Sequence, residues 1–166
     1  MPLTTPQAFK LEHEEIHDAL IRASRDGGAV GEAAKRVARI LQPHVEKEET
    51  FALPPLGLFE EVARGVRPAA AGEAVDMIEH LRGELDTMLA EHRMIIGALE
   101  EFLQAARAHS RIEYVELASK LIAHIRTEGH VLYPAALVLG DYLKLLYGIS
   151  ANPFRHPQGR SSPTTA

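Results

Sequence analysis

Four stretches of the chain place apolar residues three and four positions apart, which is the pattern of amphipathic helices. The pattern predicts four long helices, over about residues 6–25, 32–52, 72–108 and 110–132. Pro43 is expected to kink the second helix and Pro134 to interrupt the last. Ser110 and Glu113 have the spacing of a helix-capping box. These elements predict an all-α fold, an antiparallel four-helix bundle, followed by a short helix over 135–147.

Composition narrows the class of protein. The 166 residues are 46% hydrophobic and carry a net charge of −5, with no run of basic residues, so nucleic acid is not an expected partner. No apolar run is long enough to span a membrane, and the first ten residues do not resemble a signal peptide. Absence of cysteine excludes disulfides and thiolate metal sites and fits a cytoplasmic protein. One domain is expected over 1–149, with a flexible tail over 150–166.

The chain also repeats itself. Two sets of polar residues recur at nearly the same distance, which predicts two related helical hairpins packed with pseudo-twofold symmetry. The sets are Glu12-His13 with Glu91-His92, 79 residues apart, and His44 and Glu48 with His124 and Glu128, 80 residues apart.

Histidine and glutamate side chains lie within the apolar faces of these helices. They are His13, with His17 at the edge of the same face, His44, Glu48, His92, His124 and Glu128. A buried carboxylate is costly unless a positive charge compensates it, and imidazole and carboxylate are ligands for divalent iron, manganese or zinc. A lone histidine on an apolar face is more often an ordinary core residue, but two repeated His-x3-Glu pairs predict a metal site. The other histidines, His80, His109, His130 and His156, are expected to face solvent.

Six or seven ligands are too many for one tetrahedral zinc, whereas two ions that share Glu48 and Glu128 fit the number. His17 can reach the same metal as His13 if its side chain turns inward. In that case one ion would take His13, His17 and His44, and the other would take His92 and His124. Without His17 the centre would be nearly symmetric.

In these segments the chain resembles the hemerythrin-like family, also called HHE cation-binding domains. The similar segments are Leu11-Glu12-His13-Glu14-Glu15-Ile16, His44-Val45-Glu46-Lys47-Glu48-Glu49, Glu91-His92-Arg93-Met94-Ile95 and His124-Ile125-Arg126-Thr127-Glu128 with Leu132-Tyr133-Pro134. The resemblance, which spans about residues 9–135, implies a cofactor of two non-haem iron ions bridged by carboxylates and by oxide, hydroxide or water. It implies binding of O2 or NO for sensing, storage or stress protection.

The chain departs from the oxygen carriers of that family at three positions. Ile96 stands where they have a second histidine, and Glu128 stands where they have an aspartate. Gly129 replaces a glutamate that commonly follows the bridging one. The set is more similar to the bacterial branch that handles nitrosative stress and repairs iron centres. Two alternatives therefore stay open, a di-iron enzyme acting on peroxide or nitric oxide, and an iron-handling protein.

Overall fold

The computed structural model describes residues 3–149, and every regular element in that range is helical. Five helices of 15 residues or more form the body of the molecule. They are α1 (Gln7–Ser24), α2 (Gly28–Lys47), α4 (Ala71–Ala108), α5 (Ile112–Thr127) and α6 (Tyr133–Tyr147). Shorter elements connect them, namely the π-helical turns η1 (Glu48–Ala52) and η3 (Glu128–Leu132), the 3-10 helix η2 (Pro54–Leu58) and α3 (Phe59–Ala63). The prediction of an all-helical bundle is confirmed.

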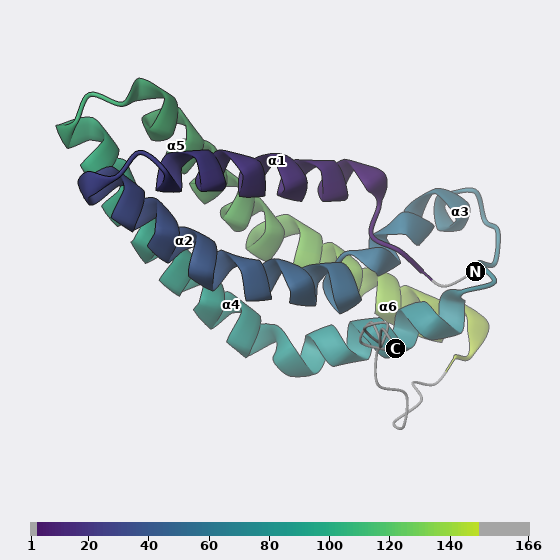
Figure 1. Cartoon of the computed structure of the whole chain (residues 1–166). Coiled ribbons are helices and arrows are strands. Elements are labelled where there is room, and N and C mark those ends of the chain that lie inside the picture. Colours follow the sequence, from purple (N-terminus) through teal and green to yellow (C-terminus); the bar gives the residue numbers. More distant parts are fainter. Residues whose placement is uncertain (1–2, 150–166) are drawn as a thin grey trace, which may run out of the picture.

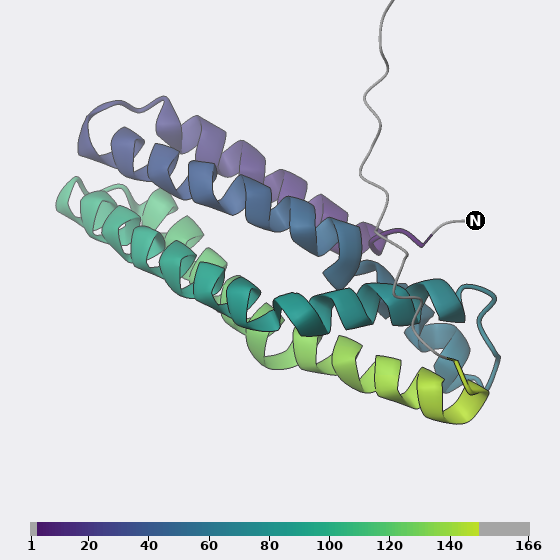
Figure 2. The ribbon, with the colours of Figure 1, turned by 90° about the horizontal axis from the view of Figure 1, so that it is seen from below.

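The long helices pack as two hairpins (Figures 1 and 2). α1 and α2 lie side by side, and α4 lies beside the rod formed by α5, η3 and α6. The turns that close the two hairpins lie at the same end of the molecule in both views. α4 has 38 residues and is therefore about 57 Å long, so it extends beyond the first hairpin and packs there against α6 and η2.

Some predicted helix boundaries were wrong. α2 begins at Gly28, earlier than predicted, because Gly27 and Gly28 make the turn after α1 with positive φ angles of 74° and 57°. It then continues through Pro43. Ser110 does not cap α5, since its own φ is 54° and the helix start has no side-chain cap. Pro134 does not interrupt the last helix, because it lies in the first turn of α6, where a proline has no N–H to lose.

A polar layer crosses the middle of the bundle between two apolar clusters. The first cluster includes Leu41 and Ile95, and the second includes Phe51 and Met88. Along the chain, His44 therefore lies between Leu41 and Phe51, and His92 lies between Met88 and Ile95. The layer consists of His13, His44, Glu48, His92 and Glu128, each at most 5% exposed. Apolar packing on both sides keeps these groups away from bulk water.

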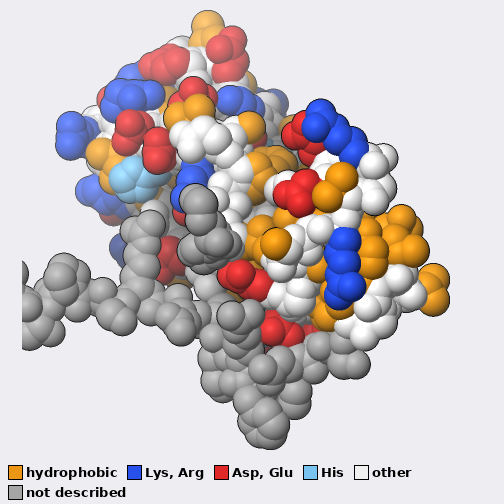
Figure 3. All heavy atoms as spheres, turned by 90° about the vertical axis from the view of Figure 1, so that its right-hand side faces the viewer, with side chains coloured by type: hydrophobic (Ala, Val, Ile, Leu, Met, Phe, Trp, Pro, Cys, Tyr) orange, Lys and Arg blue, Asp and Glu red, His pale blue; other side chains and the backbone are white. Residues whose placement is uncertain are grey.

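The surface mixes apolar and charged side chains. At the end of the molecule near α3, hydrophobic side chains lie exposed among charged ones (Figure 3), and Phe59 and Val66 are among the exposed apolar residues. Within residues 3–149, no helix combines the length and apolarity that crossing a membrane requires. The segment 150–166, predicted to be flexible, lies outside the described residues.

Candidate metal centre

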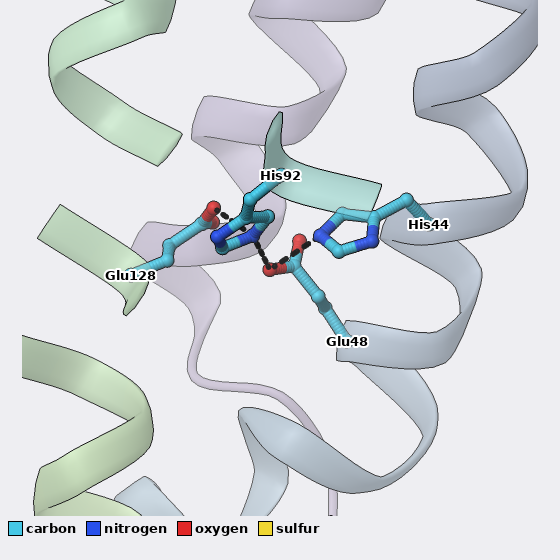
Figure 4. A group of neighbouring side chains, drawn as sticks. All are labelled: His44, Glu48, His92 and Glu128. Atoms are coloured by element: carbon cyan, nitrogen blue, oxygen red, sulfur yellow. Dashed lines mark ion pairs between the residues drawn. The ribbon is translucent and has the colours of Figure 1, made fainter. Parts of the chain in front are cut away.

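The first donor group combines residues from two elements of each hairpin. His44 lies in the last turn of α2, Glu48 begins η1, His92 lies in the middle of α4 and Glu128 begins η3. One donor atom of each lies within 4.8 Å of all the others, and all four side chains point toward one another (Figure 4). The Nε2 atom of His44 is 3.4 Å from Glu48 Oε1, and Nε2 of His92 is 3.6 Å from Glu128 Oε2.

The second donor group lies beside the first and shares one residue with it. It consists of His13 on α1, His124 on α5 and Glu128. The Nε2 atom of His124 is 2.8 Å from Glu128 Oε1, and Nε2 of His13 is 3.7 Å from the same oxygen. Glu48 also reaches this group, because its Oε2 is 3.7 Å from His13 Nε2. Glu128 therefore belongs to both groups, and Glu48 faces both.

Three further carboxylates hold the outer nitrogens of three histidines. Glu49 lies 3.0 Å from Nδ1 of His13, Glu91 lies 2.7 Å from Nδ1 of His44, and Glu12 lies 3.2 Å from Nδ1 of His124. When Nδ1 donates its hydrogen to a carboxylate, the lone pair on Nε2 is left to face the centre. This arrangement is typical of metal-binding histidines. Helical periodicity does not identify these glutamates as part of the site, because each contacts a histidine on another helix.

The fourth histidine, His92, meets a glycine instead. Gly129 is the counterpart of Glu49 at the 80-residue offset, and a Cβ atom built on it would lie 3.2 Å from His92 Nδ1 and 3.3 Å from Leu89 Cδ2. Close packing of the imidazole against the backbone of η3 therefore accounts for the glycine. Three histidines of the centre are held by carboxylates, while His92 is held by packing.

Tyr133 is the site residue that the sequence analysis missed. Its side chain is fully buried, and its hydroxyl donates a hydrogen bond to Glu48 Oε1. The hydroxyl oxygen of Tyr133 also lies 3.3 Å from Nε2 of His44 and 3.1 Å from Nε2 of His92. Burial, together with the negative charges of Glu48 and Glu128, raises the pKa of Tyr133 far above its ordinary range.

Buried carboxylates and imidazoles shift one another's pKa values strongly. Burial lowers the pKa of His13, but the carboxylates around it outweigh burial and raise the pKa to about 9. Burial likewise lowers the pKa values of His44 and His124, and contacts with Glu48 and Glu128, respectively, raise them above the ordinary value. Burial raises the pKa of Glu48, but its imidazole and hydroxyl partners hold that pKa well below the ordinary range.

Three buried atoms of the centre make no hydrogen bond among the described residues, although one of them, Glu128 Oε1, lies 2.8 Å from His124 Nε2 at ion-pair distance. They are Nε2 of His13 and both carboxylate oxygens of Glu128. Unpaired polar atoms at full burial are costly, and a bound cation would satisfy all three at once. The donor types also fit, because imidazole nitrogen and carboxylate oxygen both bind divalent transition metals. The buried His and Glu groups could therefore hold a metal ion.

The structure does not bring His17 into the centre. Its side chain is 55% exposed, and its nearest charged partner is Asp18, with 3.5 Å between Nδ1 and Oδ1. The buried face of α1 continues from His13 through Ile16 and Leu20. These two residues lie on one side of His13 around the helix, and His17 lies about 40° to the other side. The inclusion of His17 among the ligands is therefore corrected.

The expected grouping of the histidines also differs from the observed one. Had His17 been a ligand, His44 would have joined His13 on one ion. Instead His44 of α2 faces His92 of α4, and their ring centroids are 4.6 Å apart. His13 of α1 faces His124 of α5, at 5.6 Å. Each donor group therefore draws one histidine from each hairpin.

The remaining histidines lie away from the centre. His109 and His130 are exposed, as predicted. His80 is half-buried and packs edge-on against Phe51, with the ring centroids 4.4 Å apart, so it does not simply face solvent. His156 lies outside the described residues.

The positions of His13 and His17 lead to a direct test by substitution. His17→Ala is expected to leave the metal content unchanged and to alter the free energy of unfolding by no more than about 0.5 kcal/mol, as for other exposed residues. His13→Ala, on the same helix, is expected to lower the metal content. Elemental analysis of both purified variants measures the effect. A loss of metal in His17→Ala equal to that in His13→Ala would contradict the observed geometry.

Comparisons with family models, with curated proteins and with solved structures find no match for this chain. The functional assignment therefore depends on the residues and the geometry described above.

Proposed function

We propose that this protein is a hemerythrin-like, non-haem di-iron protein that binds O2 or NO at its metal centre. The observation that carries the proposal is the pair of donor groups that share Glu128, each with two histidines. Two ions side by side, with Glu48 and Glu128 between them, would use every inward-facing donor of the polar layer. The resemblance of the His-x3-Glu segments to the hemerythrin-like family supports the same assignment.

The donor types favour iron over zinc. Four imidazole nitrogens and two carboxylates exceed what one tetrahedral zinc site takes, and thiolates are absent because the chain has no cysteine. Iron accepts this mixture of nitrogen and oxygen donors at higher coordination numbers. When bound, the two irons would supply the redox chemistry and the binding position for a small ligand.

The chain's own residues would set the conditions for that chemistry. His13 and His124 would hold one ion, His44 and His92 the other, and Glu48 and Glu128 would lie between them. The apolar clusters on both sides exclude bulk water, which strengthens electrostatic interactions inside the bundle. Carboxylates behind three of the imidazoles fix the orientation of the rings and increase their basicity.

The proposal includes an antiparallel order of the four helices and a pseudo-twofold relation between the hairpins. Both glutamates of the repeat begin a π-helical turn, in η1 and in η3. Glu12 and Glu91 also occupy equivalent positions, and each contacts the histidine of the other hairpin, His124 and His44 respectively. These reciprocal contacts support two copies of one hairpin around a shared centre.

Iron content is the primary test of the proposed function. Protein purified from iron-replete cells is expected to contain close to two irons per chain, because there are two donor groups. Elemental analysis measures the ratio. Addition of O2 to the reduced protein should then produce a new visible spectrum that disappears when O2 is removed. A single zinc, or protein that is purified from iron-replete cells without any metal, would contradict the proposal. Irreversible oxidation with consumption of peroxide would favour the enzymatic alternative.

A further inference from the structure

The hydroxyl of Tyr133 lies among the donor atoms of the first group rather than behind them. It is 3.3 Å from Nε2 of His44 and 3.1 Å from Nε2 of His92, and it hydrogen-bonds to Glu48. Its ring stacks on the His92 imidazole, with 5.2 Å between centroids and an angle of 25° between planes. Both π-turn geometry and ring packing hold this oxygen at the polar layer.

The spacing of this oxygen is that of a ligand. Two donor atoms bound to one transition-metal ion at bond lengths of about 2.1 Å, and at right angles to each other, are about 3 Å apart. The distances from the Tyr133 oxygen to the two Nε2 atoms, 3.1 and 3.3 Å, are close to that value. The Glu48 oxygen lies farther from the same nitrogens, at 3.4 and 3.8 Å.

We propose that Tyr133 is an oxygen ligand of the metal ion held by His44 and His92. This inference rests on the proposed di-iron function and goes beyond its histidine and carboxylate set. When the ion binds, the O–H bond of the phenol breaks, an oxygen–metal bond forms and the proton is released to solvent, with no change in the oxidation state of the metal.

The two ions of the centre would then differ. The counterpart of Tyr133 at the 80-residue offset is Leu53, which occupies the same position after its own π-helical turn. Leucine has no donor atom, so the ion held by His13 and His124 receives no phenolate. That ion therefore keeps the coordination position at which an exogenous ligand such as azide binds.

Tyr133→Phe tests the assignment, because it removes the hydroxyl and preserves the ring that packs against His92. The ferric wild-type protein is expected to show a visible phenolate-to-iron charge-transfer band, and laser excitation in that band should enhance tyrosine ring vibrations in the Raman spectrum. The variant is expected to retain at least one iron and to lose both signals. Tyr142→Phe, at an exposed position on the same helix, is the matched control and should retain both.

Iron content separates failure of this inference from failure of the proposed function. Two irons in the wild type with an unchanged band and Raman spectrum in Tyr133→Phe would overturn Tyr133 as a ligand and leave the di-iron proposal intact. Wild-type protein that takes up no iron would overturn both. Loss of all iron in Tyr133→Phe, with the band present in the wild type and in Tyr142→Phe, supports the assignment.

Discussion

Glu128→Gln is expected to reduce the iron content from about two per chain to less than one. Glu128 is the residue that both donor groups share, so its substitution would remove a ligand from each of the two proposed ions. Both of its oxygens are buried without a hydrogen bond among the described residues, and a bound cation would satisfy them. Glutamine keeps the shape of the side chain and removes the charge. Elemental analysis after iron reconstitution measures the loss.

The matched control is Glu116→Gln, at an exposed glutamate of α5, the helix that precedes η3. It should retain two irons. Circular dichroism in the presence of a chelator should show equal helix content in the wild type and in both variants, because the substitution removes no apolar packing. Retention of two tightly bound irons in Glu128→Gln would show that iron binding does not depend on this carboxylate.

The sequence predicted much of this centre because its residues follow helical periodicity. In each pair, His44 with Glu48 and His124 with Glu128, two polar residues four apart fall within an apolar stripe, and the folded chain buries both glutamates. Periodicity alone failed at the edge of such a stripe. His17 lies near enough to the apolar face of α1 to be included, and only the packing of α1 against its neighbours shows that it faces solvent.

Tyr133 could not be placed by α-helical periodicity at all. Five residues after Glu128, it would lie about 140° around an α-helix from that side chain. The π-helical turn η3 changes this, because the Tyr133 N–H bonds to the carbonyl of Glu128 and the wider turn brings the tyrosine back toward the centre. A single sequence gives no clear signal for a π turn. The contacts of Glu12 and Glu91 with histidines of the other hairpin depend on tertiary packing, so they too could not be predicted from the sequence.

The metal-free protein is expected to become less stable as the pH rises from about 6.5 to about 9. The carboxylates around His13 raise its pKa in the folded state to about 9, against about 6.5 in an unfolded chain. A raised folded-state pKa contributes stability that is fully present below the unfolded value and is lost as the pH rises through the folded value. His13 alone accounts for up to roughly 3 kcal/mol, and His44 and His124 act in the same direction.

At acid pH the dependence is opposite, because the stability of the fold falls as the pH is lowered. The pKa of Glu48 is held below its ordinary value, so this carboxylate stabilises the fold above about pH 4.3, its unfolded value, and the contribution is lost as the pH falls toward the folded value. The metal-free protein should therefore be most stable between about pH 4.3 and 6.5. Thermal melts of chelator-treated protein across pH 4 to 9 locate this maximum.

Bound iron should counteract the loss of stability that the metal-free protein shows as the pH rises above about 6.5. Metal ions compete with protons for Nε2, so their binding tightens as the imidazoles deprotonate, and a ligand that binds only the folded state stabilises it by an amount that grows with affinity. The difference in melting temperature between loaded and chelated protein is therefore expected to widen from pH 6.5 to 9. His17→Ala, which removes an exposed imidazole, should reproduce the wild-type pH profiles of both the loaded and the chelated protein. A metal-free melting temperature that stays constant over this range would show that protonated histidines do not compensate Glu48 and Glu128 in the folded chain.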